Sequence, residues 1–78
     1  MIQVYENIRK IRELSGLTRE FVASELNMSP SGYGKIERGE VDLTISRLFQ
    51  IAEVFNVSPG SLIFLDISSV IKSHMQNS

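Results

Sequence analysis

Apolar residues recur at intervals of three and four along most of the chain, the spacing expected of one buried face of an α-helix. The first row runs from about residue 4 to residue 14 and comprises Val4, Ile8, Ile11 and Leu14. Thr18 is then a good N-cap for a short second helix, with Phe21, Val22, Ala23 and Leu26 facing inward. No alternation typical of β-strands competes with these rows, so the pattern predicts an all-α fold.

A third helix has the clearest limits. Ser29 can accept a hydrogen bond from a free amide of the first turn, and Pro30 suits the first helical position, where no intrahelical bond is lost. Gly39 is the matching stop signal. Tyr33 and Ile36 can face inward, which leaves an outer face of Ser31, Gly32, Lys35 and Arg38.

The connection between the second and third helices is very short. Only Asn27 and Met28 separate them, so the two helices must turn sharply on each other, as in a helix-turn-helix. The outer face of the third helix is small, polar and partly cationic. It predicts a surface that is presented to something outside the protein.

Two further helices follow a polar loop. Thr44 caps the fourth, whose inward row is Leu48, Ile51, Ala52 and Phe55, and Ser58-Pro59 begins the fifth. Residues 58–78 carry more apolar side chains than one short terminal helix can bury, and a further turn beginning at Asp66 or Ser68 would make a sixth helix. We interpret residues 1–78 as a single domain of five helices, with a sixth left open, whose part 58–78 contributes to dimerisation.

Composition and charge narrow the class of protein. Seventy-eight residues with 42% hydrophobic content suffice for one small core. The absence of cysteine excludes a disulfide and a thiolate zinc site, and no secretory or membrane-spanning pattern is present, so we expect a cytoplasmic protein. A net charge of −1 argues weakly against nucleic-acid binding. Any basic patch must arise by spatial sorting, with Arg19, Lys35 and Arg38 on one face and Glu25, Glu53 and Asp66 elsewhere.

Residues for catalysis are scarce. The one histidine, His74, lies near the end of the sequence, and the serines and carboxylates fit capping or solvent-exposed roles better than an acid-base pair. Metal-ligand spacings and glycine-rich phosphate loops are absent. We therefore expect no enzymatic activity, no metal and no cofactor.

The third helix has two interpretations. It is either a capped core helix or a recognition helix, whose first turns present short polar side chains and amides to the major groove of DNA. Gly32 and Gly34 favour recognition, because each costs about 1 kcal/mol relative to alanine inside a helix and buries nothing useful. Close packing against the second helix would also account for them, so these residues alone leave both interpretations open.

The chain resembles the Cro and lambda-repressor type of helix-turn-helix transcription regulators, also called the xenobiotic-response-element family. The residues that carry the resemblance read TREFVASELNMSPSGYGKIERG and, after the loop, DLTISRLFQIAEVFNVSPGSL. The match spans roughly Asn7 to Leu62. It implies a lambda-repressor-like fold and a partner of double-stranded DNA.

The resemblance also implies residue roles. Arg19 stands where a glutamine commonly contacts a phosphate, and Thr44 and helix amides would hold other phosphates. The base-reading positions carry Pro30, Ser31 and Lys35, and the remaining DNA-binding candidates are Ser29, Gly32 and Arg38. Because Pro30 has no polar side-chain group, we expect DNA shape and backbone contacts to supply much of the specificity.

The family further implies a structural ion pair between Arg12 and Glu37; the alternative is two unrelated surface charges. A separate expectation concerns Phe49, which projects to the side of the inward row of the fourth helix. With the surplus apolar residues of the C-terminal part it predicts a homodimer interface of Phe49, Phe64, Leu65, Ile67 and Ile71. A twofold dimer would place two third helices on two half-sites about one DNA turn apart.

The sequence thus predicts a homodimeric, sequence-specific transcription regulator acting on a pseudo-palindromic operator. Its length and apolar C-terminal part resemble the autoregulatory controller proteins of restriction-modification operons, while phage repressors and antitoxins stay open. The alternative is an antitoxin or other protein-interaction module whose apolar tail binds a partner protein. The operator sequence, the regulated gene, any inducer and the choice between repression and activation are not encoded in recognisable residues.

Overall fold

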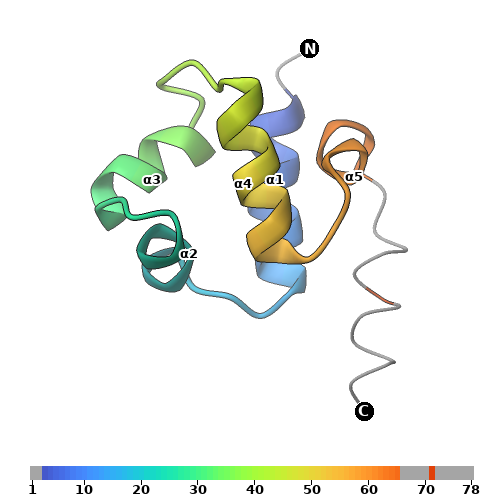
Figure 1. The fold of residues 1–78 in the computed structure, drawn as a ribbon, viewed down its shortest axis with the longest axis horizontal. Coiled ribbons are helices and arrows are strands. Elements are labelled where there is room, and N and C mark those ends of the chain that lie inside the picture. Colours follow the sequence, from blue (N-terminus) through green and yellow to red (C-terminus); the bar gives the residue numbers. More distant parts are fainter. Residues whose placement is uncertain (1–2, 66–70, 72–78) are drawn as a thin grey trace.

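The computed structural model describes residues 3–65 and residue 71, and the regular secondary structure of this part of the chain is entirely helical (Figure 1). Its elements are α1 (Gln3–Leu14), α2 (Arg19–Glu25), α3 (Pro30–Glu37), α4 (Ile45–Phe55) and α5 (Pro59–Phe64). The predicted all-α fold of five helices is confirmed. The proposed restart at Asp66 or Ser68, and Ile67 of the proposed interface, lie outside the described residues.

Side-chain caps define where four of the helices begin. The hydroxyls of Thr18, Ser29, Thr44 and Ser58 accept hydrogen bonds from the backbone N–H three residues later. Each bond satisfies one of the orphan amides of a first helical turn. The helix starts expected at these four residues are therefore confirmed.

The helices enclose one apolar core. α2 and α3 pack together on one side, α1 and α4 lie in the middle, and α5 lies against α1 and α4 on the other side (Figure 1). The fully buried residues include Ile8, Val22, Tyr33, Ile51 and Leu62, one from each helix. Because every helix contributes to the same core, the orientation of α3 depends on the whole domain.

Two residues predicted to face inward are exposed instead. Leu14 is 55% exposed and Phe21 is 47% exposed. Leu14 is the last residue of α1, and Leu17 in the following loop packs against the core in its place. α2 is only seven residues long and buries Val22, Ala23 and Leu26, so that Phe21 lies to the side of the buried row. Our expectation that Phe21 faces inward was wrong.

A buried polar residue docks α5 onto α1. Asn7 is 4% exposed, and its Nδ2 donates to the carbonyl oxygens of Leu62 at 2.8 Å and Ile63 at 3.3 Å. These carbonyls belong to the last turn of α5, where intrahelical donors run out. Asn7 therefore fixes the position of the short C-terminal helix.

Candidate nucleic-acid interface

The inner face of α3 holds the helix against the domain. Tyr33 and Ile36 are buried in the core, as predicted, and Ser29 Oγ accepts a hydrogen bond from Gly32 N at 3.0 Å. The turn before α3 contains Asn27 with φ of 57°. Asparagine tolerates this left-handed conformation better than most residues, which allows the sharp connection from α2.

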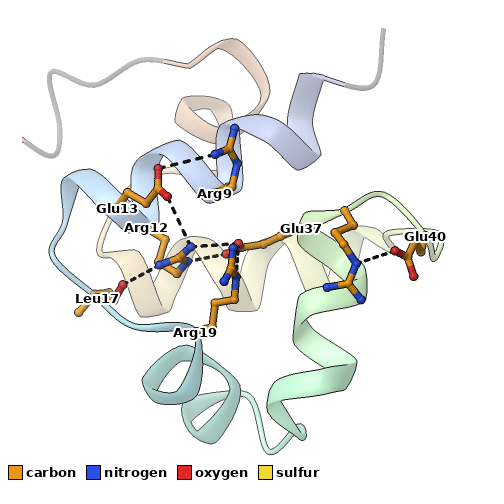
Figure 2. A network of polar contacts seen from close by, with 8 residues as sticks. Arg9, Arg12, Glu13, Leu17, Arg19, Glu37 and Glu40 are labelled. Carbon is orange, nitrogen blue, oxygen red and sulfur yellow. Dashed lines mark hydrogen bonds and ion pairs between the residues drawn. The ribbon is translucent and has the colours of Figure 1, made fainter.

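A buried carboxylate joins three helices (Figure 2). Glu37 of α3 accepts from Arg12 of α1 through two contacts, Nε to Oε2 at 2.6 Å and Nη2 to Oε1 at 3.1 Å. Arg19 of α2 donates from Nε to the same Oε1 at 3.1 Å. Arg12 Nη1 also donates to the Leu17 carbonyl at 2.9 Å, which adds the loop between α1 and α2. The orientation of α3 is thus fixed by charge as well as by apolar packing.

The environment of Glu37 sets its charge state. Burial alone would raise the pKa of Glu37, but hydrogen bonds from Arg12 and Arg19, with the Tyr33 hydroxyl nearby, outweigh burial and hold that pKa below its usual value. The Glu37 hydrogen bond in turn raises the pKa of Arg12. Burial also raises the pKa of Tyr33, whose hydroxyl lies beside Glu37 in a geometry short of a regular hydrogen bond. Glu37 is therefore ionised and Tyr33 neutral near pH 7.

The outer face of α3 is open to a ligand. Ser29, Pro30, Ser31 and Lys35 are exposed, and Gly32 is partly exposed. The Ser29 hydroxyl accepts from its own helix and keeps its O–H as a donor, and α3 begins with amide groups that point outward along the helix axis. This face offers the short polar groups that the sequence placed on it.

Arg19 occupies a position between the core and solvent. Its side chain is 51% exposed, while its Nε is bonded to Glu37. The family resemblance implied a phosphate contact for Arg19 but did not imply its bond to Glu37. Figure 2 shows the Arg19 side chain reaching from α2 toward Glu37 of α3, and because half of this side chain is exposed, an anion there would be bound by a cation whose direction is already fixed.

The side chain of Arg38 is exposed, as expected, and it packs over the backbone of Gly34. Gly34 is buried, and the guanidinium of Arg38 lies over it. Arg38 Nε donates to Glu40 Oε2 at 2.5 Å. Gly34 therefore does not open the α3 backbone to a ligand. Its lack of a side chain makes room for the side chain of Arg38.

Two acidic residues of α2 and α4 share a hollow next to the turn that leads into α3. Glu25 and Glu53 line one hollow together with Leu26, Asn27, Gln50 and Val54, at the C-terminal ends of α2 and α4. Thr44, expected to contact a phosphate, is exposed at the N-terminus of α4, where its Oγ1 accepts from Arg47 N at 3.0 Å. Arg47 in turn lies 3.4 Å from the carbonyl of Leu26, between α4 and the end of α2.

A separate apolar surface lies along α4. Phe49 is 56% exposed and Ile45 is 75% exposed, and both line an open groove that continues to Val57 and Pro59. Phe64 is 82% exposed on α5 and Ile71 is exposed, whereas Leu65 is half-buried against the core. The sequence pattern gives no signal for an exposed Ile45, because an isoleucine three residues before Leu48 extends the predicted inward row.

The whole arrangement of a capped α2, a two-residue turn and an α3 with a polar outer face corresponds to a known family model. That model is described as helix-turn-helix and matches residues 8–62. The chain belongs to the helix-turn-helix family. It is a DNA-binding transcription regulator of the Cro and lambda-repressor type, with α2 and α3 as the motif. Comparisons with curated proteins and with solved structures gave no match.

Two other kinds of site were tested on the described part of the chain. No group of three or more His, Cys, Asp or Glu residues there could hold a metal ion. None of the helices in residues 3–65 is long and apolar enough to cross a membrane.

Proposed function

We propose that this regulator binds a pseudo-palindromic operator as a homodimer, with α3 of each copy in the major groove. The observation that carries the proposal is the division of α3 into two faces. Tyr33, Ile36 and Glu37 hold its inner face, and the exposed Ser31 and Lys35 leave the outer face polar and accessible. An α-helix of this kind fits the major groove and presents side chains of its first turns to base edges.

The distribution of charge supports this proposal despite the net charge of −1. Arg19 is bonded to Glu37 of α3 and Lys35 is exposed on α3, while Glu25 and Glu53 share a hollow at the C-terminal ends of α2 and α4. A cationic surface of this kind attracts phosphates and displaces their counterions. In this proposal Arg19, Thr44 and the first amides of α3 hold the DNA backbone.

Two copies are part of the proposal because one short helix contacts few base pairs. The groove along α4, with the exposed Ile45 and Phe49, offers apolar area for a second copy, and Phe64 is a further exposed apolar residue on α5. Exposed apolar patches of this kind mark interfaces. A twofold axis through this surface would set the spacing of two half-sites at about one DNA turn.

Lys35→Ala is expected to weaken operator binding and to relax the preference at one base pair. Lysine can donate to guanine O6 and N7, a contact worth about 1–3 kcal/mol of discrimination. Titration of labelled operator and of single-base variants measures both effects. Lys10→Ala is the matched control, since it removes the same charge from α1, where Lys10 pairs with Glu6 at 3.7 Å. Equal affinity and equal base preference in Lys35→Ala would contradict the role of Lys35.

The groove also keeps a second candidate function in view, a module that binds another protein through its apolar surface. Ionic strength separates the two functions. Phosphate binding predicts that log K falls linearly as log salt rises, because counterions are released. Binding of an apolar partner predicts little such dependence. A measured operator affinity that hardly changes between low and high salt would favour the protein partner.

We extend the proposal to autoregulation, as in the controller proteins that the sequence resembles. The expected result is a footprint in the DNA upstream of the chain's own reading frame. The protected region should contain two related half-sites, one for each copy of α3. Protection of other DNA alone would contradict autoregulation and indicate a regulator that acts on other genes.

A further inference from the structure

The side chain of Arg38 lies on the outer face of α3 instead of extending beyond its end. Arg38 is the C-cap of α3, and helical side chains lean toward the N-terminus of their helix. The three atoms nearest to a Cβ added at Gly34 all belong to Arg38, with Nη1 at 3.0 Å. The guanidinium therefore occupies the space that a side chain at position 34 would take. It brings a fork of N–H donors next to Lys35.

Glu40 fixes the direction of this fork. Its Oε2 accepts from Arg38 Nε at 2.5 Å, so the brace occupies one edge of the guanidinium. Nη1 and Nη2 remain as donors for an acceptor outside the domain. The side chains of Arg38 and Glu40 are 57% and 50% exposed. Surface pairs of this kind contribute little to the stability of a fold.

We propose that Arg38, braced by Glu40 above Gly34, is a specificity-determining residue that binds a guanine of each half-site. The proposal rests on the proposed function and names a residue beyond Ser31 and Lys35 that selects the operator. Arginine donates in bidentate fashion to guanine O6 and N7, and this contact requires a fixed fork more than it requires net charge.

The carboxylate of Glu40 favours a base over a phosphate as the target of Arg38. The pair of Arg38 and Glu40 carries no net charge, so it adds little to the general attraction for the DNA backbone. Orientation of the fork is what the pair supplies. Removal of Glu40 therefore has two opposite expected effects: every duplex gains from the loss of a negative charge, and the preferred guanine loses its advantage.

The test begins with selection of the preferred duplex from random DNA, followed by affinities for the same duplex with each guanine replaced in turn. At one guanine per half-site the wild-type chain should discriminate by about five- to 150-fold, the range of a good bidentate contact. Arg38→Lys keeps the charge and should lose most of this factor. Glu40→Gln should lose much of it while binding unrelated duplexes at least as tightly as the wild type.

Gly34→Ala tests the same geometry without touching either charge. Its methyl group would meet the end of a flexible side chain, so Arg38 must move while the fold keeps its backbone. Discrimination at that guanine should fall, and the thermal midpoint should rise, because alanine favours a helix over glycine. Gly60→Ala in α5 is the control: its Cβ has only Ser58 Oγ nearby, at 3.8 Å, and it should leave the guanine preference unchanged.

Three outcomes would overturn the proposal. Unchanged discrimination in all three variants would remove Arg38 from base recognition. A uniform loss over all duplexes in the Arg38→Lys variant would assign Arg38 to a phosphate. A wild-type chain that selects no duplex would overturn the proposed function itself, and this inference with it, whereas the first two outcomes leave that function in place.

Discussion

Replacing Glu37 with glutamine is expected to lower the free energy of unfolding by about 3–5 kcal/mol, the usual cost of removing one partner from a buried ion pair. The side chains of Glu37 and Arg12 are only 2% and 8% exposed, so the variant leaves the charge of Arg12 buried beside a neutral amide. Small domains have a total stability of about 5–15 kcal/mol, and the loss would be a large part of it. Urea unfolding at neutral pH, followed by circular dichroism, measures the change.

Glu13→Gln is the matched control for this experiment. Glu13 is 53% exposed, and its contacts to Arg9 and Arg12 span 3.9 and 4.0 Å. Loss of a surface pair of this kind should cost about 0–1 kcal/mol. If Glu37→Gln is no less stable than Glu13→Gln, the three-helix junction at Glu37 does not hold α3 in place. Base preference, measured where the variant is folded, should change little.

The same carboxylate predicts a dependence of stability on acid. Hydrogen bonds from Arg12 and Arg19, with the Tyr33 hydroxyl nearby, hold the pKa of Glu37 below its usual value despite burial. A lowered pKa in the folded state contributes stability above the pKa of an unfolded glutamate, about 4.3, and this contribution is lost as the pH falls toward the folded value. The difference in unfolding free energy between wild type and Glu37→Gln should therefore shrink below about pH 4. A constant difference between pH 7 and pH 3 would contradict the prediction.

Phe49→Glu is expected to give monomers and to weaken operator binding by about 100-fold or more, since a dimer bound to two half-sites gains 10²–10⁴ in affinity over one copy. The substitution places a charge in the apolar groove of α4, where Phe49 is 56% exposed and its loss leaves the core intact. Sedimentation at several concentrations measures the oligomeric state, and titration of operator and isolated half-site measures the affinity.

Phe21 provides the control for Phe49. It is 47% exposed on α2, outside the groove, so Phe21→Glu should leave the sedimentation of the dimer unchanged. The affinity of Phe49→Glu for an isolated half-site should also match that of the wild type. A Phe49→Glu variant that still sediments as a dimer would place the interface elsewhere on the molecule.

Local chemistry is what the sequence predicts best. The four capping hydroxyls mark the starts of their helices because each is decided by residues within one turn of it. Periodicity located Tyr33 and Ile36 in the core for the same reason. Leu14 and Phe21 were misplaced because a helical row gives the direction of a side chain but not where the neighbouring helix ends.

Contacts between distant parts of the chain were harder to foresee. A buried Asn7 breaks the rule that buried positions are apolar, and only the end of α5 explains it. The packing of Arg38 over Gly34, with Glu40 as its brace, is local in the chain, but it depends on a side-chain conformation that no spacing encodes. Arg12 and Glu37 came from the family resemblance, while the second bond from Arg19 to Glu37 became visible only in three dimensions.

The junction at Glu37 has a consequence for engineering. The residues that fix α3 to the domain, Tyr33, Ile36 and Glu37, are distinct from the exposed Ser31 and Lys35. Outward positions can therefore be randomised in a library while the anchoring positions stay constant, with little cost in stability. The domain would then serve as a scaffold whose target sequence is reprogrammed by exchanging one face of a helix of eight residues.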